Sequence, residues 1–279
     1  MVDLGNYNEL EIAREVDFGV YLTSEDGDIL LPKKYLPEGA KVGDFVRVFV
    51  YRDSEDRVIA TNLTPYATVG QFAGLLCKDT SSFGAFLDWG LEKDLLVPLN
   101  NQKDKMVPGR KYCVYVYLDD ASDRIVGTAK INKYLQNDNI QVKEGEQVEV
   151  LVAAYTDLGY NVIINNTYLG LLYRNEVFKD LEIGDKLPAY IKTIRPDNKI
   201  DVTLRKPDAD TFSEMDETSA KVMQLLEEQN GTLNLSDKSD PEDIYRVVGA
   251  SKKMFKRAVG NLYKANRIEI YPDYIKLRR

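Results

Sequence analysis

Cations gather near the end of the chain, in a segment that could bind phosphate groups. The run GASKKMFKRAVGNLYKANRIEI occupies residues 249–270, and from Gly249 to Arg279 nine lysines and arginines stand against two acids, a net charge of +7. The whole chain has a formal net charge of −8, so acids dominate elsewhere. Contacts from lysine and arginine to phosphate supply most of the sequence-independent affinity for nucleic acids. The candidate contacts are Lys252, Lys253, Lys256, Arg257, Lys264 and Arg267.

Aromatic side chains supply a second kind of chemistry, the stacking of rings on nucleic-acid bases. The stretch FGAFL carries Phe83 and Phe86 in a segment typical of a strand. Their odd spacing puts the two rings on opposite faces of a regular strand, so only one of them faces a core unless a bulge intervenes. An exposed ring stacks with any base, which is worth roughly 1–3 kcal/mol. Packing within the fold is the alternative role for both rings.

The absence of histidine excludes many kinds of catalytic site. No catalytic dyad or triad that uses histidine can form, and no zinc site with a histidine ligand. The two cysteines, Cys77 and Cys113, cannot complete a four-cysteine zinc site, and their apolar surroundings in the sequence predict buried thiols. Solvated hairpin turns explain the acids of YLDDASD and RPDNKID better than a metal-dependent nuclease site does. We therefore expect no enzyme, no cofactor and no metal.

The chain repeats itself three times before the basic segment. FGVYL at Phe18, FGAFL at Phe83 and LGYNV at Leu158 each precede a turn-prone stretch and an apolar run, which predicts a β-hairpin. Two further β-rich runs joined by a polar turn follow in each unit. Five strands in roughly 65–75 residues, spaced too closely for helical crossovers, predict a small antiparallel barrel of the OB type. The expected units are residues 1–66, 67–138 and 139–207.

These repeats resemble the S1 domain, an RNA-binding OB module. The order FGAFL, LLVP and PGRKYCVYVYLDDASDR carries the resemblance, which covers most of residues 1–206. In that family RNA is held by two aromatics on the second strand, a third ring after the hairpin and an acid–base pair in the last turn. For the second unit the resemblance implies a platform of Phe83 and Phe86 and a turn pair of Asp120 and Arg124, with Pro98 at the third-ring position.

The first and third units depart from this set in different ways. Pro32 stands at the third-ring position of the first unit, and residues 1–66 carry a net charge of −6, which favours a structural or protein-contact role. In the third unit Leu158 and Asn161 replace the strand aromatics, and the turn is doubly cationic. The implied contacts are Phe18, Tyr21, Asp53 and Arg57 as weaker candidates in the first unit, and Tyr173, Arg195 and Lys199 in the third.

The C-terminal residues 208–279 have the element order of a winged helix. A first helix ends at Asn230-Gly231, and the short strand TLNLS follows it. Asp240 and Pro241 begin a second helix, Ser251 caps a third, and RIEIYPDYIKL predicts a closing hairpin. On the third helix the apolar residues recur at helical spacing and leave the cations towards solvent. A solvated basic face is the alternative to nucleic-acid contact, which the helix-turn-helix context favours.

Three S1-like units followed by this winged helix resemble the conserved virulence factor B family, most specifically in the run SKKMFKRAVGNLYK. The resemblance implies RNA binding and a regulatory effect on gene expression in a bacterium, without known catalysis. We therefore predict a mainly β protein with a C-terminal α+β domain: three tandem S1-like OB-fold five-stranded barrels followed by a winged helix. The predicted function is that of a non-enzymatic RNA-binding regulator whose partner is single-stranded RNA.

Two other functions stay open at this point. A winged helix that enters the major groove of duplex DNA would make the chain a transcription regulator. The acidic first unit would suit a protein-interaction scaffold on the ribosome or polymerase. The sequence shows no secretory signal, no uninterrupted run of 18 apolar residues and no dimerisation element, so we expect a cytoplasmic monomer that contacts no membrane.

Overall fold

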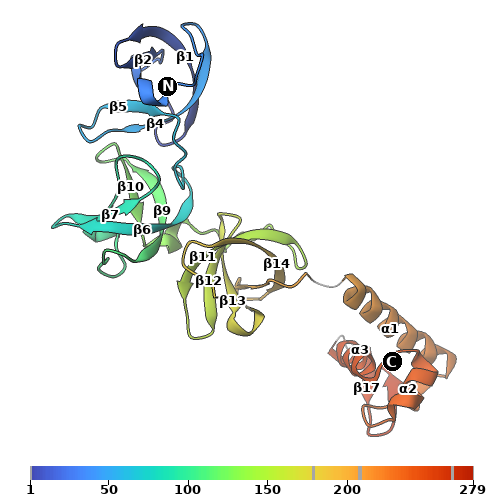
Figure 1. Ribbon diagram of the computed structural model, residues 1–279. Coiled ribbons are helices and arrows are strands. Elements are labelled where there is room, and N and C mark those ends of the chain that lie inside the picture. Colours follow the sequence, from blue (N-terminus) through green and yellow to red (C-terminus); the bar gives the residue numbers. More distant parts are fainter. Residues whose placement is uncertain (1, 178–179, 207–208, 265–266, 279) are drawn as a thin grey trace. The chain divides into compact units, whose positions relative to one another are not determined.

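The chain folds into two compact units, Met1–Lys206 and Pro207–Arg279. The computed structural model describes residues 2–177, 180–206, 209–264 and 267–278, apart from the side chains of 209–217 and Lys264. The first unit contains three closed barrels, coloured blue, green and yellow in Figure 1, and the second combines helices with a small sheet. This is the mainly β architecture with a C-terminal winged helix that the sequence predicts.

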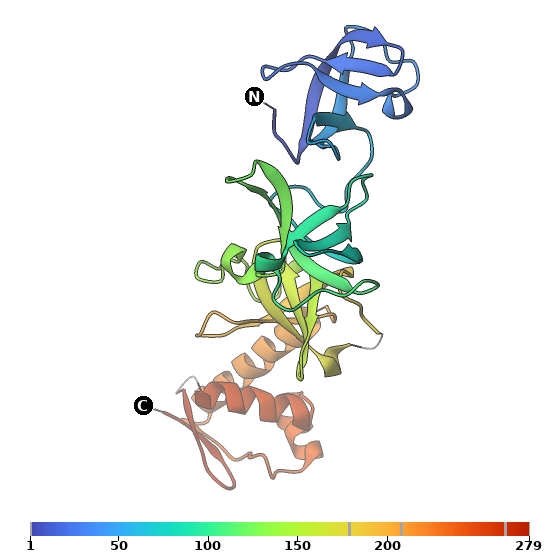
Figure 2. The ribbon, with the colours of Figure 1, turned by 90° about the vertical axis from the view of Figure 1, so that its left-hand side faces the viewer.

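All three barrels share one topology, in which the five strands close in the order first, second, third, fifth, fourth (Figures 1 and 2). The third and fifth strands pair in parallel, and the other pairings are antiparallel. Barrel 1 consists of β1 (Tyr7–Val16), β2 (Gly19–Leu22), β3 (Ile29–Pro32), β4 (Phe45–Arg52) and β5 (Val58–Thr61). Barrel 2 consists of β6 (Phe72–Thr80), β7 (Gly84–Asp88), β8 (Leu95–Pro98), β9 (Lys111–Asp119) and β10 (Arg124–Thr128). Barrel 3 consists of β11 (Gln147–Tyr155), β12 (Gly159–Ile164), β13 (Tyr168–Tyr173), β14 (Lys186–Ile194) and β15 (Ile200–Thr203).

Alternating apolar residues fill each barrel. Along β13, for example, every second side chain is buried while those between are partly exposed, as the two-residue period of a strand requires. Short 3-10 turns follow the third strand of each barrel: η1 (Lys33–Tyr35), η2 (Leu99–Asn101) and η4 (Arg174–Glu176). A fourth, η3 (Ile131–Tyr134), lies in the segment that connects barrel 2 to barrel 3.

In every barrel the backbone of the third strand comes so close to the start of the second strand that only glycine fits there. A Cβ atom on Gly19, Gly84 or Gly159 would lie 2.2–2.5 Å from a carbonyl oxygen of the third strand. The first strand of each barrel also shifts register opposite the second strand, as at a β-bulge. The bulge and the glycine together allow the short second strand to curl against its neighbours, and the residue before each glycine lies outside the regular strand.

Apolar contacts join the successive barrels of the first unit. Phe49 on β4 packs edge-on against Trp89 with ring centroids 5.8 Å apart, within a core that also holds the buried residues of barrel 2. Between barrels 2 and 3, a Cβ atom on Gly74 would lie 2.1 Å from the Cα of Gly184. The Asn166 side chain accepts a hydrogen bond from the Phe72 backbone N–H at 2.8 Å. These contacts account for the compactness of residues 1–206.

The second unit has the element order expected for a winged helix. Its elements are α1 (Ala209–Glu228), β16 (Thr232–Leu233), α2 (Pro241–Val248), α3 (Lys252–Lys264), β17 (Ile268–Ile270) and β18 (Ile275–Leu277). The helix α1 begins at Ala209. Phe255 and Val259 of α3 are buried together with Ile268 of β17, which holds the hairpin against that helix (Figure 2). Among the described residues, no helix is both long enough and apolar enough to span a membrane.

Candidate nucleic-acid interface

Barrel 2 presents two aromatic rings on its outer face. Phe83 is 59% exposed and Phe86 is partly exposed, and their rings meet edge to face with centroids 5.8 Å apart. The spacing of the two residues predicts opposite faces of a strand, but Phe83 precedes β7 and the neighbouring strand shifts register between Cys77 and Asp79. The bulge that would allow both rings to lie outside the barrel is therefore present.

Barrel 1 repeats this platform. Phe18 is 58% exposed, and its ring lies edge to face with that of Tyr21 at a centroid distance of 6.4 Å. The Arg14 guanidinium lies 3.9 Å from the centre of the Tyr21 ring. Ring and cation are thus adjacent, the combination that stacks a base beside its phosphate.

The backbone fixes the first platform residue in the same way in all three barrels. The first N–H of the 3-10 turn after the third strand donates to the carbonyl oxygen of Phe18, Phe83 or Leu158, over 2.9, 3.1 and 3.0 Å respectively. Each of these residues is held just before the obligatory glycine and projects outward. The platform position is therefore a property of the barrel backbone and does not depend on the side chain it carries.

Barrel 3 uses the platform positions differently. Leu158 is 61% exposed and Asn161 is partly exposed, so the outer face has no aromatic pair. The hydroxyl of Tyr173, the expected third ring, accepts a hydrogen bond from Arg195. Arg195 also forms a bidentate pair with Asp201, with nitrogen–oxygen distances of 2.9 and 2.7 Å. Asp201 was missed in the sequence, although an acid inside the apolar run IDVT was a signal for it.

The turn of barrel 3 carries the two expected cations, and an acid neutralises each of them. Lys199 pairs with Asp197 over 2.6 Å, so each cation has its own carboxylate. The hydrogen bonds that Arg195 donates to Asp201 raise the pKa of Arg195, and the hydrogen bond that Lys199 donates to Asp197 lowers the pKa of Asp197. Arg195 and Lys199 can therefore reach phosphate only in competition with these acids.

The turn pair expected in barrel 1 forms as predicted. Arg57 donates two hydrogen bonds to Asp53, at 2.9 Å from Nε and 2.7 Å from the terminal nitrogen. Burial alone would raise the pKa of Asp53, but hydrogen bonds from the Arg57 side chain and from the backbone of Arg57 and Glu55 lower it overall. The pair is local to one hairpin.

The corresponding pair of barrel 2 is replaced by a reciprocal contact between two barrels, so the expectation of an Asp120–Arg124 pair is wrong. Arg124 binds Asp56 of barrel 1, and Arg52 of barrel 1 binds Asp123. Within the described chain Asp120 makes no ion pair. The hydrogen bond from Arg124 lowers the pKa of Asp56. The turn between β9 and β10 therefore holds barrel 2 against barrel 1.

This reciprocal contact borders a cavity of about 480 Å³ that the barrel 2 platform also lines. Three cations reach it: Arg52, Lys93 and Arg124. Arg52 and Arg124 take part in the reciprocal pairs, and Lys93 lies 3.4 Å from Asp56 while donating to the Asp53 carbonyl oxygen. Rings and cations for binding a nucleotide are present together, with the cations already paired.

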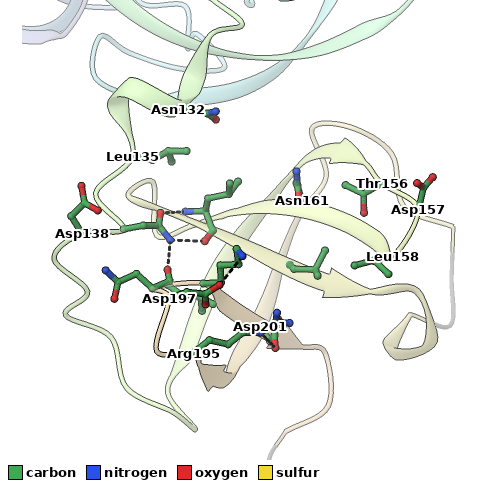
Figure 3. Close-up of a pocket in the computed structure, with 17 residues that line it drawn as sticks. Asn132, Leu135, Asp138, Thr156, Asp157, Leu158, Asn161, Arg195, Asp197 and Asp201 are labelled. Atoms are coloured by element: carbon green, nitrogen blue, oxygen red, sulfur yellow. Dashed lines mark hydrogen bonds and ion pairs between the residues drawn. The ribbon is translucent and has the colours of Figure 1, made fainter.

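A larger pocket of about 690 Å³ covers the outer face of barrel 3 (Figure 3). Figure 3 shows Leu158 and Asn161 on one side of it, Asn132 and Leu135 on another, and Arg195 beside Asp201. Asn137, from the connecting segment, exchanges two hydrogen bonds with the backbone of Leu169 at 2.8 and 2.9 Å. The segment between barrels 2 and 3 is thus fastened to the edge of this pocket.

The expected basic contacts of the second unit, on α3 and at the base of the β17–β18 hairpin, fall into distinct groups. Lys253, Arg257 and Arg267 are exposed and, within the described chain, take part in no ion pair. Lys256 lies 3.7 Å from Asp237. Lys252 is half-buried and donates to the Ser239 carbonyl oxygen at 2.8 Å, so its amine stabilises the loop before α2 and does not face solvent as expected. The side chain of Lys264 lies outside the described part.

The predicted capping residues of α2 and α3 are found at the ends of these helices. Asp240 caps α2 by accepting from the Glu242 N–H at 3.0 Å, and Gly249 ends that helix in a left-handed conformation with φ 76°. Ser251 then begins α3, whose Phe255, Ala258 and Val259 are buried. The opposite face of α3 is left to carry Lys253 and Arg257.

Both cysteines lie in apolar surroundings within barrel 2. Cys77 and Cys113 are free and buried, as expected from the sequence, and burial raises the pKa of the Cys113 thiol to about 12. Among the described residues no three histidine, cysteine or acidic side chains lie together as a metal site would need.

Comparison with protein families identifies two domain types in the chain. The S1 domain matches residues 4–63 and 69–130, which contain the strands of barrels 1 and 2, and the CvfB-like winged helix domain matches residues 220–277. Barrel 3 has the topology of the other two barrels. OB barrels bind oligonucleotides, and helix-turn-helix domains bind DNA, so the domains present are those of a nucleic-acid-binding protein.

Relatives match the chain over most of its length. The YitL protein of Bacillus subtilis is 26% identical over 284 residues, covering 95% of this chain and 90% of its own. Conserved virulence factor B of Staphylococcus epidermidis is 24% identical over 246 residues, covering 86% and 82%. A multidomain protein with nucleic acid binding domains from Streptococcus pneumoniae, of known crystal structure, is 23% identical and covers 99% of this chain and 98% of its own, with a TM-score of 0.43.

Proposed function

Because this chain is a relative of conserved virulence factor B that carries S1 domains and a CvfB-like winged helix domain, we propose that it is a non-enzymatic RNA-binding regulator of bacterial gene expression. Its ligand is single-stranded RNA. The barrels stack bases on their outer rings, and the basic face of α3 contributes contacts to phosphates.

The observation that carries this proposal is the outward pair of Phe83 and Phe86. Two rings with exposed faces, on a barrel whose core is already filled by other side chains, add nothing to the hydrophobic core. Their faces suit the stacking of unpaired bases, which a duplex keeps inside its own stack. The platform therefore supports binding of a single strand.

The second unit adds sequence-independent attraction to phosphates. Lys253, Arg257 and Arg267 carry charge that no described carboxylate neutralises. The reciprocal pairs that hold barrels 1 and 2 leave Arg52 and Arg124 with little free charge at the first cavity. The second unit thus adds electrostatic attraction to the stacking of bases on barrels 1 and 2.

A second candidate function is duplex DNA binding through the winged helix. It is favoured by the position of the unpaired cations on α3, the helix that follows the α2–α3 turn and enters the major groove in helix-turn-helix proteins. The exposed rings of barrels 1 and 2 would have no role in that function.

Fluorescence anisotropy with labelled strands of equal length distinguishes these functions. The full chain should bind single-stranded RNA more tightly than single-stranded DNA or duplex DNA, and binding should weaken as salt rises. Tighter binding to duplex DNA would move the function to transcription. Failure to bind any of the three would leave α3 as a docking surface for a protein and would overturn the proposal.

A further inference from the structure

A third cavity, of about 560 Å³, lies between barrels 2 and 3 and concentrates positive charge. Lys103 reaches it from the loop that follows η2, and Lys130 and Lys133 reach it from the segment that connects the two barrels. Among the described residues, Asp104 is the one acid that lines it. We call this cavity, with its three lysines, the lysine groove.

The lysines of this groove differ from the cations of the two cavities described above in having no carboxylate partner. Within the described chain none of Lys103, Lys130 and Lys133 forms an ion pair, and Asp104 forms none either. The cations that line the cavity of about 480 Å³ and the pocket of about 690 Å³ are all paired with acids. The lysine groove therefore retains a net positive charge that an anionic ligand could neutralise.

Aromatic rings hold one of these charges in place without neutralising it. The Lys133 amine lies 4.7 Å from the centre of the Tyr134 ring and 5.6 Å from that of Tyr117. Tyr134 in turn stacks on Tyr115 with centroids 3.8 Å apart, so the rings are themselves fixed. The interaction with Tyr134 raises the pKa of Lys133, which keeps its amine protonated at neutral pH. A positioned ammonium loses less side-chain entropy when it meets a phosphate.

The lysine groove continues into the pocket of barrel 3. Both cavities are lined by Asn132, Asn161 and Leu169, and Figure 3 shows Asn132 and Asn161 at the barrel 3 pocket. Within the described chain the side-chain amides of Asn132 and Asn161 have no hydrogen-bond partner. An amide offers both donors and an acceptor, as the edge of a base does.

We propose that the lysine groove and the barrel 3 pocket form one binding site for single-stranded RNA, in which Lys103, Lys130 and Lys133 contact consecutive phosphates. Asn132 and Asn161 hydrogen-bond the base edges where the two cavities meet. The proposal rests on the function proposed above and adds a site that the aromatic platforms do not predict. It assigns barrel 3 a binding role that uses amides and lysines in place of stacked rings.

The salt dependence of binding tests this site. Each phosphate contact to a single strand contributes about 0.7 to the slope of log affinity against log salt, so removing three contacts should reduce that slope by roughly 2. Lys103→Ala/Lys130→Ala/Lys133→Ala should therefore lose this much slope and bind at least about tenfold more weakly in low salt. The matched control, Lys41→Ala/Lys143→Ala/Lys186→Ala, removes the same charge from exposed lysines outside the groove.

The outcomes separate the groove from the general function. If the unaltered chain binds none of the strands, the proposed function fails. If it binds single-stranded RNA but the groove variant and the control have equal slopes, only the groove assignment is overturned. Thermal denaturation checks that the groove variant folds; should Lys133→Ala disturb the tyrosine stack, Lys103→Gln/Lys130→Gln leaves that stack intact and should reduce the slope by about 1.4. A loss of slope in that double variant supports the groove, and an unchanged slope contradicts it.

Discussion

Barrels 2 and 3 share a backbone and differ in what that backbone presents. Both have a register shift in the first strand, a glycine that admits no Cβ atom, and an N–H that fixes the residue before that glycine. Barrel 2 places Phe83 and Phe86 at the two outer positions, whereas barrel 3 places Leu158 and Asn161 there. The requirements of folding therefore fix where a platform lies, and the outer side chains remain free to set its chemistry.

The glycines of the shared backbone should show the largest effect of any single change. We expect Gly84→Ala to destabilise barrel 2 by more than about 3 kcal/mol, because its Cβ would lie 2.5 Å from the Val97 carbonyl oxygen and the backbone must shift. Gly159→Ala should do the same in barrel 3, where the contact would be 2.2 Å. Denaturant unfolding measures both effects. Near-native stability in either variant would contradict the view that the two barrels are built alike.

The outer positions should be exchangeable without loss of stability. Leu158→Phe/Asn161→Phe gives barrel 3 the platform of barrel 2. The control Leu158→Ala/Asn161→Ala removes the same native groups, the amide of Asn161 included, without adding rings. We expect the variant with two phenylalanines to bind single-stranded RNA about 5-fold or more tightly than this control, as the stacking of one base would provide. Equal affinity of the two variants would show that position alone does not make a platform.

The basic face of α3 contains a glycine with no such steric requirement. A Cβ atom on Gly260 meets nothing within 4 Å among the described residues, and the residue is helical. Gly260→Ala should therefore stabilise the second unit by about 0.5–1 kcal/mol, the helix-propensity difference between the two residues. Thermal denaturation measures this, and it also serves as the control for Gly84→Ala. A destabilised variant would show that Gly260 is needed by the fold.

The smallest effect concerns the turn pair of barrel 1, which barrel 2 replaces by contacts between barrels. Asp53 has a lowered pKa in the folded chain, so the folded state binds fewer protons than the unfolded state as pH falls past about 4. The stabilisation by Asp53 is present above that pH and is lost as pH falls through the lowered pKa. The midpoint of thermal unfolding should thus fall between about pH 5 and pH 3 more in the unaltered chain than in Asp53→Asn. If the unfolding midpoint fell equally in the unaltered chain and in Asp53→Asn, the Asp53–Arg57 pair would not be the source of the pH dependence.

Repetition in the sequence was sufficient to predict the architecture, because the alternation of apolar residues, the glycines and the helix caps act locally. The same reasoning placed Phe18, Tyr21 and the Asp53–Arg57 pair correctly. It failed for Arg124, whose partner Asp56 comes from the preceding barrel, and it missed Asp201, which pairs with Arg195 within one hairpin. The lysine groove was missed because Lys103 follows η2 and Lys130 follows β10, and these segments meet only in the folded barrel, where the Ala129 N–H donates to the Asn101 carbonyl oxygen at 2.8 Å.

The most direct test of the account measures the affinity of two variants for single-stranded RNA. Phe83→Ala/Phe86→Ala removes the platform of barrel 2, and Phe45→Ala removes a ring that is 65% exposed on barrel 1 and belongs to neither platform. We predict that the platform variant binds roughly 5-fold to 100-fold more weakly at unchanged stability, and that Phe45→Ala binds as the unaltered chain does. Equal affinity of both variants, or a loss of affinity that follows a loss of stability, would contradict base stacking on the outer face of the barrel.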